Sequence, residues 1–182
     1  MEYNNPSEIV KDLSFGKDAR EKIMAGVDKL TDAVRSTLGA SGKCVIYEDA
    51  LGRPVITKDG VTVAESVVLL DPVENIGATL IKEAAKNTVK EAGDGTTTAT
   101  VLAHSLLHLA NDKKYAQTVR PIKEGILSGM NKVIQYLDDN AVEVKDDMLE
   151  SVAEISCNND KALGKIISQA YSKVGKLSLI HI

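Results

Sequence analysis

The sequence has few of the residues that build disulfide frameworks or aromatic cores. Its 182 residues include two cysteines, one phenylalanine, five tyrosines and no tryptophan. Cys44 and Cys157 lie far apart and form neither a CxxC pair nor a disulfide framework, so we expect a reducing, cytoplasmic location. With so few aromatic residues, the core must consist of Val, Ile, Leu and Ala, which favours close-packed helices over a β-sandwich.

The sequence also lacks an excess of basic residues and a long hydrophobic run. There are 22 Lys and Arg against 26 Asp and Glu, a formal net charge of -4, and no segment concentrates the basic side chains. We therefore expect no nucleic acid as the main partner. Residues 1–10 are polar, without the apolar region of a secretory signal, and no stretch approaches the roughly 20 apolar residues needed to cross a bilayer. No membrane association is expected.

Apolar periodicity predicts a mainly helical chain. Residues 18–38 have the three-and-four spacing of an amphipathic helix. A second helix is predicted from an N-cap at Asp71 to a stop near Gly93. Two short β-prone runs, 44–47 and 54–57, predict a hairpin. Four further helices are predicted, each after a polar or glycine-containing segment. They cover residues 96–109, 121–137, 149–155 and 162–174.

Composition shifts suggest how the chain is divided. The polar connector at 141–147 indicates a domain boundary near Asn140, so we predict one domain over 1–140 and the start of another over 141–176. Residues 177–182, Leu-Ser-Leu-Ile-His-Ile, do not continue this architecture. Their back-translation resembles a sequencing adaptor, which indicates a foreign tail, although an ordinary frayed terminus is the alternative.

Three turns that contain glycine could surround a nucleotide: residues 37–42, 57–60 and 93–98. Glycine lets a backbone approach phosphate oxygens closely, and the free N–H groups at the start of the third helix suit an anion. Hydroxyl donors are added there by Thr96, Thr97 and Thr98. The carboxylate of Asp94 would repel a phosphate unless a hard cation such as Mg²⁺ lies between them, which favours a metal-bridged triphosphate.

Competing motifs are weaker. A Walker A loop around Lys43 fails at two required positions, Thr37 and Cys44. His104 and His108 have the spacing of a metal pair on one helix face. However, no Glu follows His104 as an HExxH motif requires, and the sequence reveals no third ligand, so we do not predict a metal there.

The three turns also carry a family resemblance. The strings Thr-Leu-Gly at 37–39, Thr-Lys-Asp-Gly-Val at 57–61 and Gly-Asp-Gly-Thr-Thr-Thr-Ala-Thr-Val-Leu at 93–102 resemble group I (GroEL-like) chaperonins. The similarity extends from about Phe15 to Lys176. It implies the N-terminal half of a chaperonin equatorial domain, mainly α with a small β-hairpin, followed by the first part of the intermediate domain.

The resemblance implies an ATP-dependent chaperone that assists protein folding in a ring-shaped chamber. Its partners would be identical subunits in a double ring, a co-chaperonin (GroES-like) and unfolded clients. The last two would bind an apical domain that is missing from this chain. The full-length parent would be an ATPase, and the isolated fragment is expected to be inactive.

The resemblance also implies a role for individual residues. The nucleotide, ATP, would be lined by Thr37, Leu38, Gly39, Ala40, Lys58, Asp94, Gly95, Thr96, Thr97 and Thr98. Of these residues, Asp94 would ligate Mg²⁺, and residues 95–98 would hold the phosphates. K⁺ would be bound by Thr37, Lys58 and Thr97. Asp59 would lie near the γ-phosphate, and the main water-activating aspartate would belong to a part of the family outside this chain.

Ala40 and Ser41 depart from the family pattern, in which Pro and Lys are usual, and this suggests a divergent branch such as a virus-encoded one. Two other functions stay open. One is a naturally short, non-catalytic protein that inserts into or caps a host chaperonin ring. The other is a helical enzyme of unrelated type that uses Asp59 and Asp94 as an acid/base pair.

Overall fold

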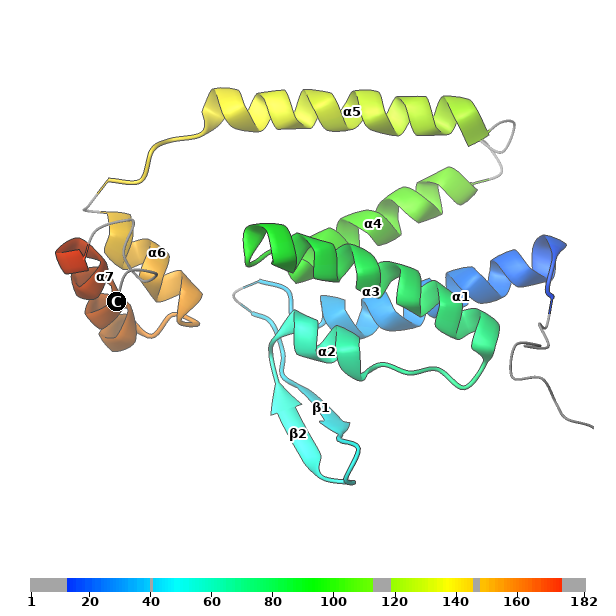
Figure 1. The fold of residues 1–182 in the computed structure, drawn as a ribbon, viewed down its shortest axis with the longest axis horizontal. Helices are drawn as coiled ribbons and strands as arrows, with labels where there is room; N and C mark the ends of the chain where they lie inside the picture. Colours follow the sequence, from blue (N-terminus) through cyan, green and yellow to red (C-terminus); the bar gives the residue numbers. More distant parts are fainter. Residues whose placement is uncertain (1–12, 40, 113–118, 146–147, 175–182) are drawn as a thin grey trace, which may run out of the picture. The chain divides into compact units, whose positions relative to one another are not determined.

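The computed structural model describes residues 13–39, 41–112, 119–145 and 148–174, and its elements belong to two compact units (Figure 1). The first unit, residues 1–117, holds α1 (Gly16–Arg35), β1 (Val45–Glu48), β2 (Pro54–Thr57), α2 (Gly60–Ser66), α3 (Pro72–Ala92) and α4 (Thr96–Asn111). The second, residues 118–182, holds α5 (Val119–Asn140), α6 (Leu149–Ser156) and α7 (Lys161–Val174). The mainly helical class with one small hairpin is confirmed.

The predicted domain limits of 1–140, 141–176 and 177–182 stay predictions. The second compact unit contains α5 together with the two helices that follow it. Residues 177–182 lie outside the described residues. Within the described residues, no helix is long and apolar enough to cross a membrane.

Branched aliphatic side chains and alanine form the core of the first unit, as the composition predicts. The core lies where α1, α2, α3 and α4 pack together (Figure 1). Its buried members come from the first three of these helices and are Val27, Leu30, Val34, Val63, Ala64, Ala78 and Ile81. Burial of each large aliphatic side chain contributes about 1.5–3 kcal/mol, so this cluster is the main source of stability in the unit.

Two glycines bring α1 and α3 into backbone contact. A Cβ built on Gly26 would overlap the carbonyl oxygen of Glu74 and lie 2.6 Å from its carbonyl carbon. A Cβ on Gly77 would overlap the carbonyl oxygen of Ile23 and lie 2.9 Å from its carbonyl carbon. Each glycine therefore sits where a side chain on one helix would displace the backbone of the other.

Both ends of α3 are capped as the sequence predicts. The carboxylate of Asp71 accepts hydrogen bonds from the backbone N–H groups of Val73 at 2.8 Å and Glu74 at 3.2 Å. At the other end, Gly93 adopts the left-handed conformation, with φ 74°, and donates its N–H to the carbonyl of Val89 at 2.8 Å. These bonds satisfy groups that every helix end leaves without an intrahelical partner.

Asp71 makes the stability of the first unit depend on pH. The hydrogen bond from Lys22, at 2.5 Å, and those from the backbone of Glu74 and Val73 hold the pKa of Asp71 below its usual 3.8. A carboxylate whose pKa is lower in the folded state stabilises the fold above the unfolded pKa and loses this effect as the pH falls through the folded pKa.

We expect Asp71→Asn to flatten the acid side of the stability curve, because asparagine also caps a helix but does not titrate. Thermal melts of parent and variant, recorded by circular dichroism from about pH 6 to about pH 3, test this through the difference between their slopes. Glu83→Gln changes an exposed position on the same helix, and the pH dependence of its melting temperature should be parallel to that of the parent. Parallel curves for Asp71→Asn and the parent would contradict the prediction.

The predicted hairpin is confirmed, one residue later in its first strand. β1 and β2 pair antiparallel from Val45 opposite Thr57 to Glu48 opposite Pro54. The hairpin projects from the helices (Figure 1). Its loop is closed by Asp49, whose carboxylate accepts N–H bonds from Leu51 and Arg53 at 2.8 and 2.9 Å.

Helix α2 was not predicted from the sequence, and α1 ends earlier than predicted. The glycine that the sequence analysis assigned to a turn, Gly60, is the first residue of α2. A side-chain cap explains this helix, because the carboxylate of Asp59 accepts from the N–H of Thr62 at 2.8 Å. Helix α1 ends at Arg35, three residues before the predicted end at Leu38.

The helices of the second unit are confirmed in position and order. Within the described residues of α5, none is buried, and its apolar side chains, such as Ile126, Val133 and Leu137, are exposed. Helices α6 and α7 pack against each other, and Gly164 allows α7 to approach the backbone of Glu154 on α6.

Candidate functional site

The three glycine-containing turns of the sequence meet in the structure. The hydroxyl oxygens of Thr37, after α1, and Thr97, in the first turn of α4, are 3.3 Å apart. Gly60, at the start of α2, is buried against Thr97. A Cβ on Gly60 would overlap the hydroxyl oxygen of Thr97. Segments separated by up to 60 residues therefore share one small region, which their order in the sequence alone does not require.

The first turn is built by the end of α1. Thr37 donates its N–H and its hydroxyl to the carbonyl of Val34, at 3.0 and 2.8 Å. Gly39 adopts φ 74°, and the N–H of Gly42 returns to the Gly39 carbonyl at 2.9 Å. These bonds fix the Thr37 hydroxyl beside α4, while Leu38 is exposed. Ala40 lies outside the described residues.

The third turn presents the start of α4. Gly95 is the N-cap residue, in the left-handed conformation with φ 88°, and it has no side chain with which to cap the helix. The first-turn N–H groups and the positive end of the helix dipole therefore suit an anionic ligand. The three threonines differ in exposure, since Thr96 is buried, Thr97 is half-buried and Thr98 is exposed.

A carboxylate lies directly before this helix. Asp94 is exposed, and one of its oxygens accepts the N–H of Gly95 at 2.6 Å. This bond holds the carboxylate at the N-terminal side of α4. A hard divalent cation prefers oxygen ligands of this kind, and it could use the carboxylate together with phosphate oxygens.

The second turn contributes a cation and another carboxylate, Lys58 and Asp59, which are both exposed. Partial burial alone would raise the pKa of Asp59, but hydrogen bonds from the Thr62 hydroxyl and from the N–H groups of Thr62 and Val61 outweigh it and lower the pKa. The carboxylate is therefore ionised at neutral pH. Its hydroxyl bond to Thr62 is 2.5 Å long.

Comparison with known proteins identifies the family of this chain. The family model of the TCP-1/cpn60 chaperonins matches residues 30–179. This chain belongs to the TCP-1/cpn60 chaperonin family. The mainly helical fold with its two-stranded sheet matches the equatorial domain of chaperonins.

Solved chaperonin structures support the same conclusion. The chaperonin gp146 from bacteriophage EL 2 (Pseudomonas aeruginosa), crystallised with ATP-BeFx, has a TM-score of 0.78 and 34% identity over 90% of this chain in one crystal form. In a second crystal form the values are 0.76 and 36% over 87%. A group III chaperonin in the open state has a TM-score of 0.71 and 28% identity over 86%. The chain spans 29% and 28% of gp146 in its two crystal forms and 32% of the group III chaperonin, which is less than a third of the length of either protein.

Sequence reasoning found the three turns of this chaperonin segment but missed contacts that hold them. The bond between the hydroxyls of Thr37 and Thr97 had no sequence signal, because it joins two helix ends that are distant in the chain. The cap of α2 by Asp59 had a weak sequence signal, namely an acidic residue three positions before Thr62. A third group, Asp28 with His104 and His108, combines a recognised histidine pair with an aspartate that no spacing rule would select.

Proposed function

We propose that this chain supplies most of the nucleotide site of an ATP-dependent chaperonin. The observation that carries the proposal is the meeting of Thr37, Gly60 and Thr97, since it brings three turns with small or hydroxyl side chains together beside a helix N-terminus, where backbone N–H groups can receive phosphate oxygens. The crystals of the bacteriophage relative grown with ATP-BeFx support it. The residues of the three turns resemble those of group I chaperonins, which favours that group within the family.

In this site, phosphates of ATP would be held by the first turn of α4, through Gly95, Thr96, Thr97 and Thr98. Thr37, Leu38, Gly39 and Ala40 would line the nucleotide. Lys58 would place a cation or its backbone carbonyl at the phosphate end, and with Thr37 and Thr97 it would hold K⁺. Asp94 would hold Mg²⁺, which neutralises phosphate charge when bound. The exposed, ionised Asp59 would lie near the γ-phosphate.

The wider function follows from the family. In a complete subunit, these residues would position ATP for hydrolysis, and most of the catalytic effect would come from positioning and charge neutralisation. We propose that such subunits assemble with identical copies into a double ring in the cytoplasm. Hydrolysis would be coupled to the folding of client proteins, with a co-chaperonin, through an apical domain.

Loss of the Lys58 cation should weaken ATP binding to this chain. We expect Lys58→Ala to raise the dissociation constant of Mg·ATP about tenfold or more, because a hydrogen bond to a charged group contributes about 1.5–3 kcal/mol. Titration with a fluorescent ATP analogue in K⁺ buffer measures the change. The control is Lys17→Ala at the far end of α1, where Lys17 forms an exposed ion pair with Glu21.

Equal titration curves for Lys58→Ala and the parent would contradict a role of the Lys58 side chain in ATP binding. A parent chain that is folded by circular dichroism but binds no nucleotide would contradict the proposed function itself. That result would favour the alternative of a non-catalytic protein that acts on a chaperonin ring.

A further inference from the structure

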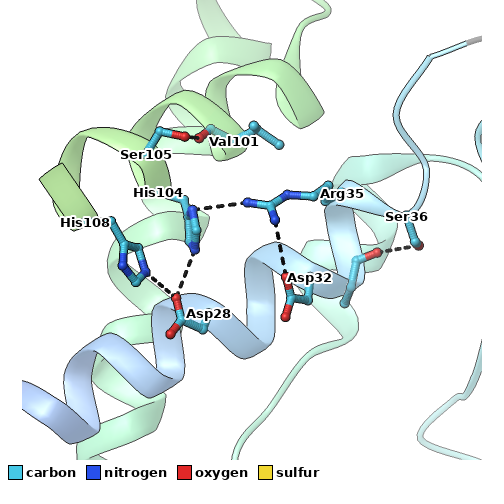
Figure 2. A network of polar contacts seen from close by, with 9 residues as sticks. Asp28, Asp32, Arg35, Ser36, Val101, His104, Ser105 and His108 are labelled. Carbon is cyan, nitrogen blue, oxygen red and sulfur yellow. Dashed lines mark hydrogen bonds and ion pairs between the residues drawn. The ribbon is translucent and has the colours of Figure 1, made fainter.

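Two histidines on α4 and one aspartate on α1 form a cluster of metal-ligating side chains, separate from the three turns. The Nε2 atoms of His104 and His108 lie 2.9 and 2.6 Å from the same carboxylate oxygen of Asp28. Figure 2 shows both imidazoles directed at this carboxylate from one face of α4. One ligand atom from each of the three residues lies within 4.8 Å of the others.

The spacing within the cluster is that of known metal pairs. Residues four apart on a helix lie one above the other on the same face, and two histidines in this arrangement bind zinc in helical metalloenzyme motifs. A zinc ion takes nitrogen and oxygen ligands at about 2.0–2.2 Å, which in a tetrahedral site puts neighbouring ligand atoms about 3.3 Å apart. The histidine nitrogens need to move away from the Asp28 oxygen by less than about 1 Å to admit an ion.

The charge of Asp28 also suits a cation. Partial burial alone would raise the pKa of Asp28, but the hydrogen bonds from His108 and His104 outweigh it and hold the pKa below its usual range, so the carboxylate is ionised at neutral pH. The side chain of His104 is 15% exposed, whereas those of Asp28 and His108 are 42% and 45% exposed. An ion can therefore enter from solvent and keep water in its remaining positions.

Arg35 fixes the tautomer of His104 in the absence of a metal. Its guanidinium nitrogen is 3.1 Å from Nδ1 of His104, and since a guanidinium only donates, Nδ1 accepts and the ring proton is on Nε2 (Figure 2). Metal binding through Nε2 requires this proton to move to Nδ1, where it would face the Arg35 donors. Arg35 has a second partner available, because its other nitrogen is 3.7 Å from the carboxylate of Asp32.

We propose that Asp28, His104 and His108 form a binding site for a first-row divalent transition-metal ion such as Zn²⁺. Two imidazoles and one carboxylate are a ligand set that such ions prefer, and three protein ligands leave at least one position for water. The ion would join α1 to α4, the two helices whose ends carry Thr37 and Thr97. The site is distinct from the proposed nucleotide site and does not depend on it.

Cobalt is the probe that tests the site, because Co²⁺ replaces Zn²⁺ in such ligand sets and its visible absorption reports low-coordinate binding. The 182-residue chain, without a histidine tag and without nucleotide, is titrated with Co²⁺ and then with Zn²⁺. We expect one equivalent of Co²⁺ to bind with intensified visible bands and to be displaced by one equivalent of Zn²⁺. A folded parent without such bands would overturn the proposal.

Variants locate the ion. His108→Ala should lower the Co²⁺ affinity at least about tenfold, because even residues that only support a ligand contribute tenfold or more. His108→Cys should restore binding and add a sulfur-to-cobalt charge-transfer band that the parent lacks, which a structural role of His108 would not produce. Arg35→Gln should bind Co²⁺ more tightly, by up to about tenfold, because the glutamine oxygen accepts the Nδ1 proton that the metal-bound tautomer of His104 carries.

Two controls match these variants. His181→Ala removes the third histidine of the chain, and Asp18→Asn removes an exposed carboxylate in the first turn of α1; both should retain the parent affinity. Circular dichroism confirms that each variant is folded. The proposal is overturned if folded His108→Ala binds Co²⁺ as the parent does, if His181→Ala loses the bands, or if Arg35→Gln binds more weakly.

Discussion

Gly26→Ala should destabilise the first unit by at least about 3 kcal/mol, at the upper end of the cost of overpacking. The new methyl group would overlap the carbonyl oxygen of Glu74, and a backbone atom cannot turn away as a side chain can. Helices α1 and α3 would have to separate, which would loosen the buried contacts of Val27 and Leu30 with α3. Because domains are stable by only about 5–15 kcal/mol, such a loss is a large fraction of the total.

Urea unfolding followed by circular dichroism measures this effect. Gly77→Ala should have a similar cost, and the double variant should cost less than the sum of the two, because both substitutions separate the same helix pair. Gly125→Ala is the matched control, since a Cβ there meets nothing within 4 Å and alanine favours helix by about 0.5–1 kcal/mol. A midpoint for Gly26→Ala equal to that of the parent would show that the helices are not in backbone contact.

Local signals explain why the sequence predicted most of the helices and the hairpin. Helix α3 has an aspartate cap, a proline in its first turn and a glycine after its last residue, and both of its ends were predicted correctly. Helix α2 has seven residues and too few apolar repeats for a periodic signal. It forms because Asp59 caps it and because Val63 and Ala64 are buried in the core, and the second of these is a tertiary effect.

The candidate site was predictable to a different degree in each of its parts. The glycines and threonines of the three turns predict a phosphate site through their residue types, but their meeting depends on how α1, α2 and α4 pack. The spacing of the histidine pair on α4 was visible in the sequence, but without a third ligand it did not lead us to predict a metal site. Its third member, Asp28, lies 76 residues before His104 and becomes a neighbour only through the contact between α1 and α4, so no local rule selects it.

Asp94→Ala should remove the dependence of ATP binding on Mg²⁺. We propose that this exposed carboxylate holds the ion between itself and the phosphates, so its loss should weaken Mg·ATP binding at least about tenfold, the lower range for residues around a metal. With Mg²⁺ chelated, the order of affinities should reverse. The parent carboxylate then repels the bare phosphates, so Asp94→Ala should bind ATP more tightly than the parent does.

This reversal separates a metal ligand from a residue that only shapes the turn. Titrations of a fluorescent ATP analogue with Mg²⁺ and with a chelator give the four dissociation constants. Asp94→Asn can still accept the N–H of Gly95, so it tests the charge while retaining the local bond seen at 2.6 Å. Glu91→Ala, an exposed carboxylate near the end of α3, should behave as the parent in both buffers. If Asp94→Ala weakens binding equally with and without Mg²⁺, the residue supports the turn and does not hold the ion.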